Sequence, residues 1–245
     1  MTHPVSNLID GLIDKLGETR IARFAWAMAW FALIGGQLHA LARHNTEDGK
    51  ADLDLPLTAA WSDPARKALA PLLEWSTPDQ VYLTYGKLWL PVFVAFTLAA
   101  FVVRRHRSPY GLEKWAWRIT LTGCVWGCLS VFGDYWLQWG KAAQEPLLTI
   151  TFVFGLPAVL LLMVGSTVLG IALLRRGFRP RLSAWLLTLT LPGLFAITMV
   201  TSMGSITLPV AFAFAIAARH LQTVGDHRVE DLDSGTPRVG AHLNP

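Results

Sequence analysis

Runs of apolar residues, each close to the length of a membrane-spanning helix, dominate this chain. They cover residues 24–42, 88–103, 119 to about 139, and 147–174. A helix of nineteen residues is about 28 Å long, which matches the ~30 Å hydrocarbon core of a bilayer. Only 16% of the residues are charged, against about 25% in a typical soluble domain. The sequence therefore predicts an all-α integral membrane protein and excludes a disordered chain or an ordinary soluble enzyme.

The last apolar stretch, residues 184–218, is too long for one crossing. As a single helix it would be about 52 Å long, far beyond the ~30 Å that a bilayer requires. Turn-forming residues lie near its middle, at 201–205. We therefore predict two short helices, 184–200 and 206–219, and six transmembrane helices in all. A re-entrant hairpin is the alternative.

The basic residues predict the orientation of the chain in the membrane. Segments 104–118 and 175–181 contain nine Lys and Arg residues but one acidic residue, Glu113. Such clusters stay on the cytoplasmic side of a membrane, so both termini are predicted to be cytoplasmic and the loop 44–84 external. The net charge of +4 is accounted for in this way, and no nucleic-acid partner is expected. The composition favours a bacterial plasma membrane.

An amphipathic helix precedes the first apolar run. Val5, Leu8 and Ile9 begin an apolar repeat of helical period that continues to Leu16, and Asp10 begins the polar face. We predict that residues 1–22 form a helix lying in the cytoplasmic interface of the membrane. Packing of this helix against the bundle is the competing interpretation.

The remaining chain divides into a transmembrane domain, 23–219, and a tail, 220–245. The tail mixes charge, Gly and Pro without apolar periodicity, which predicts disorder on the cytoplasmic side. The external loop 44–84 is acidic on balance. Within it, capping signals predict a short helix over 63–75 and a helix start at Thr77, which leads into the next span.

Ionisable residues inside a bilayer are costly and are therefore functional candidates. His39 lies sixteen residues after Arg23, and Asp134 lies sixteen residues after Arg118. Both spans run outward, so the two side chains are predicted at the same depth, ~24 Å from the inner boundary. Five further polar residues are expected near this level and complete a candidate binding cluster: Gln37, Tyr85, Lys87, Tyr135 and Gln138.

Three roles are open for this cluster. Asp134 as the anion, Lys87 as its cation and His39 as the titratable member could lock the helices together. The same residues could line a binding pocket that opens outward beneath the loop 44–84, or they could form the site of a proton-linked transporter. The sequence favours a binding or scaffold module with an outward-facing polar pocket. A small proton-linked secondary transporter is the alternative, and an integral-membrane enzyme comes third.

Other chemistry has little support in the sequence. His39 and His44 are five residues apart and do not share a helical face, so no metal site is expected. Signatures of hydrolases, zinc proteases, P-loop proteins and dinucleotide-binding proteins are absent. We therefore expect no catalytic residues and no cofactor. The expected partners are the lipid bilayer and a membrane protein or small ligand at the external face.

Overall fold

The computed structural model describes residues 4–138, 145–198, 200 and 206–233, and in these ranges the regular elements are all helical. These elements confirm the all-helical fold class. They are α1 (Pro4–Leu16), α2 (Glu18–His44), η1 (Lys50–Asp54), α3 (Pro56–Ala68), α4 (Ala70–Leu73), α5 (Pro78–Gly86), α6 (Trp89–Arg105), α7 (Gly111–Val131), the π-helical turn η2 (Phe132–Trp136), α8 (Glu145–Arg175), α9 (Arg181–Thr188), α10 (Thr190–Thr198) and α11 (Leu208–Asp233).

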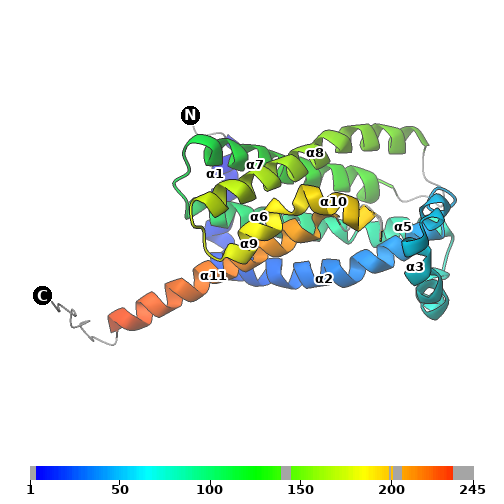
Figure 1. Ribbon diagram of the computed structural model, residues 1–245, viewed down its shortest axis with the longest axis horizontal. Coiled ribbons are helices and arrows are strands. Elements are labelled where there is room, and N and C mark those ends of the chain that lie inside the picture. Colours follow the sequence, from blue (N-terminus) through cyan, green and yellow to red (C-terminus); the bar gives the residue numbers. More distant parts are fainter. Residues whose placement is uncertain (1–3, 139–144, 199, 201–205, 234–245) are drawn as a thin grey trace, which may run out of the picture.

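The long helices form one bundle. Going around it, α2 packs on α6, α6 on α7, α7 on α8, α8 on α9, α9 on α11, and α11 again on α2. Contacts between α6 and α11 cross the middle, where Phe96, Trp117 and Phe214 are buried. Figure 1 shows α1 at one end of the bundle and α3 and α5 at the other. We call the segment 45–88, which covers that second end, the outer cap, because the sequence predicts that most of it is external.

Three helical segments are long and apolar enough to cross a membrane: Glu18–His44, Pro78–Arg105 and Val153–Arg175. The pair α9 and α10 makes a fourth if its two helices, bent by 59°, count as one span. Within the described residues α7 and α11 do not reach this standard; charged residues begin α7 and end α11. The structure therefore supports a multi-pass membrane protein with three or four spans, and six spans remain a prediction.

Large apolar side chains cover much of the outside of the bundle. Ile34 on α2 is 67% exposed, Val153 on α8 is 60% exposed and Phe195 on α10 is 72% exposed. Extended exposed apolar surface of this kind marks contact with another apolar phase. The surface and the apolar helices together support association with a lipid bilayer.

The outer cap differs from its prediction at one helix. The helix expected over 63–75 begins earlier, at Pro56, and its last turn is separated as α4. Pro56 is suited to the first helical turn. Ser62, expected near the helix start, is buried inside α3 and its hydroxyl lies 2.8 Å from Nδ1 of His44. The helix start after Thr77 is confirmed, because α5 begins at Pro78.

The amphipathic helix is shorter than the predicted segment 1–22 and packs on its own chain. It ends at Leu16, where Gly17 turns the backbone with a φ of 81°. Ile13 is fully buried against Ile21, Leu98 and Val102. This apolar contact agrees with the competing interpretation of the sequence, in which the helix packs against the bundle.

The C-terminal segment begins differently from its prediction. Helix α11 continues to Asp233 and projects beyond the bundle in Figure 1. The first part of the tail predicted to be disordered, 220–245, is thus helical, because α11 carries on past its apolar part. Residues 234–245 lie outside the described part of the chain.

Candidate functional site

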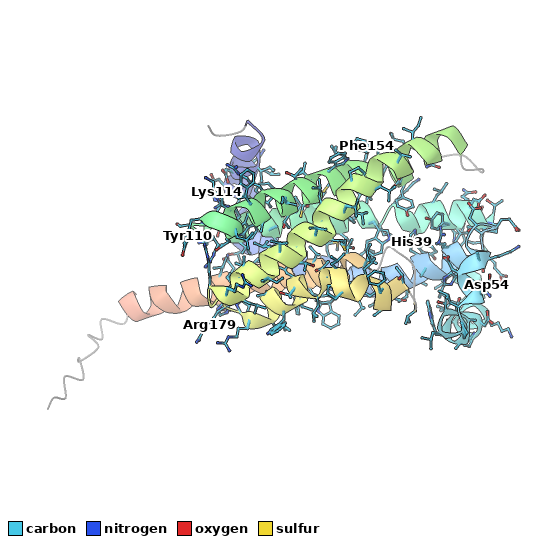
Figure 2. The ribbon with its side chains drawn as sticks, turned by 45° about the horizontal axis from the view of Figure 1, so that its top comes forward. His39, Asp54, Tyr110, Lys114, Phe154 and Arg179 are labelled. Atoms are coloured by element: carbon cyan, nitrogen blue, oxygen red, sulfur yellow. The ribbon has the colours of Figure 1, made fainter. Side chains whose placement is uncertain are left out.

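His39 lies near the end of the bundle that the outer cap covers (Figure 2), and aromatic rings enclose it. Its side chain is only 2% exposed. The imidazole stacks on Tyr82, with ring centres 4.7 Å apart, and meets the ring of Tyr135 edge to face at 5.4 Å. Nδ1 of His39 accepts a hydrogen bond of 3.2 Å from the indole N–H of Trp89. We call His39, Tyr82, Trp89 and Tyr135 the His39 cluster.

The bond from Trp89 determines the tautomer of His39. An indole nitrogen can only donate, so Nδ1 must carry a lone pair, and in a neutral imidazole the proton is then on Nε2. Nε2 is buried and has no hydrogen-bond partner among the described residues. His39 therefore presents a buried N–H donor inside the cluster, which is unusual because buried polar groups are nearly always paired.

Two tyrosines close the cluster on the side of α5 and η2. The hydroxyls of Tyr82 and Tyr135 lie 3.2 Å apart, which is hydrogen-bond distance. The ring of Tyr135 occupies the space that a side chain at position 86 would need, so only Gly86 allows this approach. Tyr135 belongs to the π-helical turn η2, and such turns are frequent at functional sites.

The other predicted cluster residues lie around the outer end of the bundle. The Tyr85 hydroxyl donates to the backbone oxygen of Leu72 at 2.8 Å, and the Gln138 amide donates to the backbone oxygen of Asp134 at 2.8 Å. The backbone oxygen of Lys87 accepts from the indole of Trp136 at 3.1 Å. Gln37, Lys87 and Asp134 have half-buried side chains.

Of the predicted set, His39 and Tyr135 are thus brought into contact with each other. Asp134 is the chain neighbour of Tyr135, and the ionic cluster of Asp134, Lys87 and His39 stays a prediction. Tyr82 and Trp89 were not among the predicted site residues. A signal for them exists, because they are seven residues apart and so fall on one face of a continuous helix.

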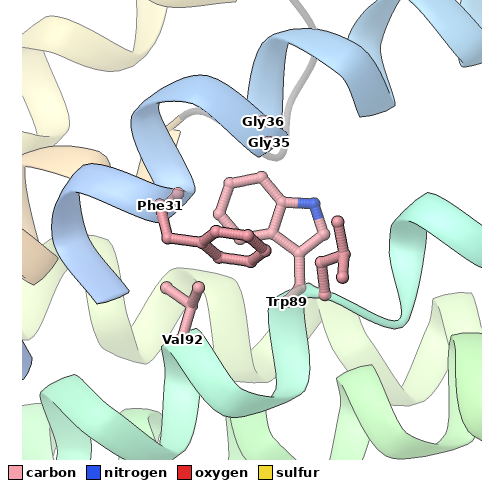
Figure 3. Close-up of a pocket in the computed structure, with 7 residues that line it drawn as sticks. Phe31, Gly35, Gly36, Trp89 and Val92 are labelled. Atoms are coloured by element: carbon pink, nitrogen blue, oxygen red, sulfur yellow. The ribbon is translucent and has the colours of Figure 1, made fainter. Parts of the chain in front are cut away.

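A groove runs between α2 and α6 next to the cluster (Figure 3). Phe31, Gly35, Gly36, Trp89 and Val92 are among the residues that line it. The groove has no space for a water molecule. Among the described residues no group of three potential metal ligands occurs. The space beside Trp89 is therefore closely packed.

The end of α2 carries the outer cap. Arg43 pairs with Asp52 of η1 at 2.8 Å. His44 meets Ser62 of α3, and Arg66 of α3 donates to the side chain of Asn45 at 3.1 Å. These polar contacts, with the aromatic contacts of His39, position η1, α3 and α5 over the bundle.

A second buried polar cluster lies at the opposite end, among the basic residues predicted to face the cytoplasm. The carboxylate of Glu113 is fully buried and accepts hydrogen bonds from Arg107 at 3.2 Å, Trp117 at 3.2 Å and Arg176 at 2.6 Å. Burial alone would raise the pKa of Glu113, but the hydrogen bonds and charge of Arg107 and the bonds from Trp117 and Arg176 hold it below its ordinary value. Glu113 thereby joins the start of α7 to the segments that directly follow α6 and α8.

Comparisons with known proteins find no matching family model, no similar curated protein and no similar solved structure. The length and composition of the apolar helices support the class of a helical, multi-pass membrane protein.

Proposed function

We propose that this chain is a six-span protein of a bacterial plasma membrane that acts as a binding or scaffold module through its external face. In this proposal the outer cap is the recognition surface, and the His39 cluster beneath it is the joint that sets its position. The observation that carries the proposal is the enclosure of His39, on α2, by residues from α5, α6 and η2. One side chain thereby couples the cap to the bundle.

The surface of the cap supports a role in recognition. Leu57 is 62% exposed, Leu72 is 47% exposed and Trp75 is 50% exposed. Asp48 and Asp54 of the same segment are also exposed, and Figure 2 shows Asp54 at the far end of the molecule. Exposed apolar side chains in a segment that also carries exposed charges are typical of protein contact surfaces. A membrane-protein partner therefore fits this surface better than a small ligand fits the packed groove beside Trp89.

A test of topology comes first. In a variant without Cys124 and Cys128, a single cysteine at Leu57 should react with a membrane-impermeant maleimide in intact cells. A single cysteine at Gly177, in the basic segment, should react only after the membrane is opened. Labelling of both positions, or of neither, in intact cells would contradict the proposed orientation.

A test of recognition uses a photo-crosslinking amino acid at Leu57 in living cells. We expect one protein adduct of discrete mass, and we expect His39→Phe to reduce it because the cap loses its position. The same amino acid at Ile34, on the apolar face of α2, is the matched control and should give no such adduct. Absence of a discrete adduct at both Leu57 and Leu72 would argue against a recognition surface.

Proton-linked transport is the second candidate, and the partly buried Asp134 next to the His39 cluster favours it. Purified protein in vesicles with an internal pH dye provides the test. Under this alternative an imposed pH gradient collapses faster with the protein than without it, and Asp134→Asn abolishes the effect. Equal rates of gradient collapse for the wild type and the variant would argue against transport, and the scaffold proposal would remain as the single candidate.

A further inference from the structure

The two basic segments of the chain meet on one surface, at the end of the bundle opposite the outer cap. Arg176 donates to the backbone oxygen of Tyr110 at 2.8 Å and to the buried carboxylate of Glu113 at 2.6 Å. Its guanidinium also lies over the ring of Tyr110, 3.5 Å from the ring centre. These contacts hold the segment 106–118 against the segment 175–185, and we call the surface that the two segments form the basic surface.

The positive charge of the basic surface is not neutralised by its own acidic residue. Glu113 is the one acidic residue in the two segments, and its buried carboxylate already pairs with Arg107 and Arg176. Within the part of the chain that the structure describes, five exposed basic side chains of this surface have no ion pair: Lys114, Arg118, Arg175, Arg179 and Arg181. Figure 2 shows Lys114 and Arg179 at this end of the molecule. The partner of this surface is therefore anionic.

Exposed aromatic side chains accompany these charges. Tyr110 is 70% exposed, Trp115 is 61% exposed and Trp185 is 52% exposed. Each tryptophan has an arginine as a helical neighbour: the guanidinium of Arg118 lies 5.0 Å from the ring centre of Trp115, and Arg181 is one turn before Trp185 on α9. A small soluble anion offers no apolar contact to these rings. The partner must then combine an anionic group with an apolar body.

The level of the basic surface in the membrane selects the partner. The candidate spans Pro78–Arg105 and Val153–Arg175 both end here, and the second, with 23 residues, is about 34 Å long, close to the ~30 Å hydrocarbon core. Side chains that directly follow a span lie among the lipid headgroups, where tryptophan and tyrosine are enriched. At this level the anionic group is the phosphate of a lipid.

We propose that the basic surface binds an anionic phospholipid of the leaflet at this end of the bundle, which is the cytoplasmic leaflet in the proposed orientation. Arg179 and Arg181 donate hydrogen bonds to the lipid phosphate, and the ring of Trp185 lies against the glycerol and the first carbons of an acyl chain. The inference rests on the membrane class that the proposed function assumes. It does not rest on the recognition surface, so loss of lipid binding should leave the crosslinked adduct at Leu57 unchanged.

The experiment compares dioleoyl phosphatidylglycerol with dioleoyl phosphatidylcholine, which has the same chains but no net charge. Binding of each lipid to the full chain in detergent is measured by native mass spectrometry. The wild type should bind phosphatidylglycerol at least tenfold more tightly, since each basic residue near an anionic lipid contributes about fivefold. Arg179→Gln with Arg181→Gln should remove most of this preference. Lys67→Gln, at an exposed lysine of the outer cap, is the matched control and should keep it.

Two further measurements separate charge from fold and lipid from soluble anion. Arg179→Lys with Arg181→Lys should keep the preference for phosphatidylglycerol, because the charge remains. Glycerophosphoglycerol, which is the headgroup without chains, should fail to displace the lipid at equal concentration.

Equal binding of the two lipids by the wild type would overturn the proposal, as would a preference for phosphatidylglycerol that survives the two Gln substitutions. Loss of the preference in the Lys variant would also contradict it, because charge would then not be the cause. Displacement of the lipid by glycerophosphoglycerol at equal concentration would identify a soluble phosphate ester as the ligand and would overturn the lipid assignment.

Discussion

Trp89 and His39 are joined by a hydrogen bond between two side chains that are almost fully buried. The indole of Trp89 is 4% exposed, the imidazole of His39 is 2% exposed, and Nε1 and Nδ1 are 3.2 Å apart. The bond links α2 to α6 and determines which nitrogen of His39 carries the proton. Loss of this hydrogen bond should therefore lower the stability of that end of the bundle and shift the position of the outer cap.

Trp89→Phe should lower the stability of the protein by about 1 to 2 kcal/mol, since it leaves Nδ1 of His39 buried without its donor. Thermal unfolding in detergent measures the effect, and Trp75→Phe, at a half-exposed tryptophan of the cap, is the control. In a His39→Phe background the cost of Trp89→Phe should shrink by about 1 kcal/mol, because the two residues are coupled. If the stability losses of the two single substitutions simply add in the double variant, the hydrogen bond contributes nothing to stability.

Glu113→Gln should destabilise the opposite end of the bundle. The substitution removes the charge that Arg107 and Arg176 share, and charge-assisted hydrogen bonds contribute about 1.5 to 3 kcal/mol each. Since both arginines are partly exposed, we expect a total loss near 2 kcal/mol in chemical unfolding. Glu74→Gln, at an exposed glutamate, should change stability by less than about 0.5 kcal/mol. Equal effects of the two substitutions on stability would argue against a structural role for Glu113.

The Glu113 cluster also predicts a pH dependence. The folded protein holds the pKa of Glu113 below its ordinary value, so the unfolded chain binds this proton more readily. The stabilisation is therefore complete above the unfolded pKa of about 4.3 and is lost as the pH falls through the lower folded pKa. The stability difference between the wild type and Glu113→Gln should narrow as the pH falls below the unfolded pKa of about 4.3. A difference that is constant from pH 7 to pH 3 would contradict this linkage.

Gly123 permits the close contact between α7 and α8. A Cβ at this position would lie 2.6 Å from the backbone nitrogen of Leu162, which is too close without movement of a helix. Gly123→Ala should therefore cost about 1 to 3 kcal/mol. Gly11→Ala, in α1 with no atom within 4 Å of the added Cβ, should be neutral or stabilising by up to about 1 kcal/mol. The comparison is made by thermal unfolding, and similar losses for both variants would exclude close packing as the cause.

Local signals in the sequence were sufficient for the helical class and for several helix boundaries. The apolar run 24–42 falls within α2, the run 88–103 falls within α6 except for its first residue, and Thr77 precedes α5 as its capping signal predicts. Such features depend on residues close together in the chain, so periodicity and capping report them directly. Local signals were misleading for α3, because Ser62 and Asp63 resemble a helix start whereas Pro56 begins the helix.

The candidate site was predictable only in part. Helical rise placed His39 and Tyr135 near one depth, and the two rings are in contact. Depth along a helix does not specify which face turns inward or which helices are neighbours, so Tyr82 and Trp89 were missed. The bond from Trp89 and the buried Nε2 of His39 depend on α2, α5 and α6 meeting at one point.

The amino-acid sequence by itself determined that this chain is helical, apolar and basic at one end, because hydrophobicity and charge act residue by residue. Tertiary structure alone decided that α1 packs on the bundle, that Glu113 is enclosed by two arginines, and that His39 is surrounded by aromatic rings. Except for the contact between Arg107 and Glu113, these contacts join segments that are distant in the chain. Their geometry follows from how complete helices pack, which no short stretch of sequence contains.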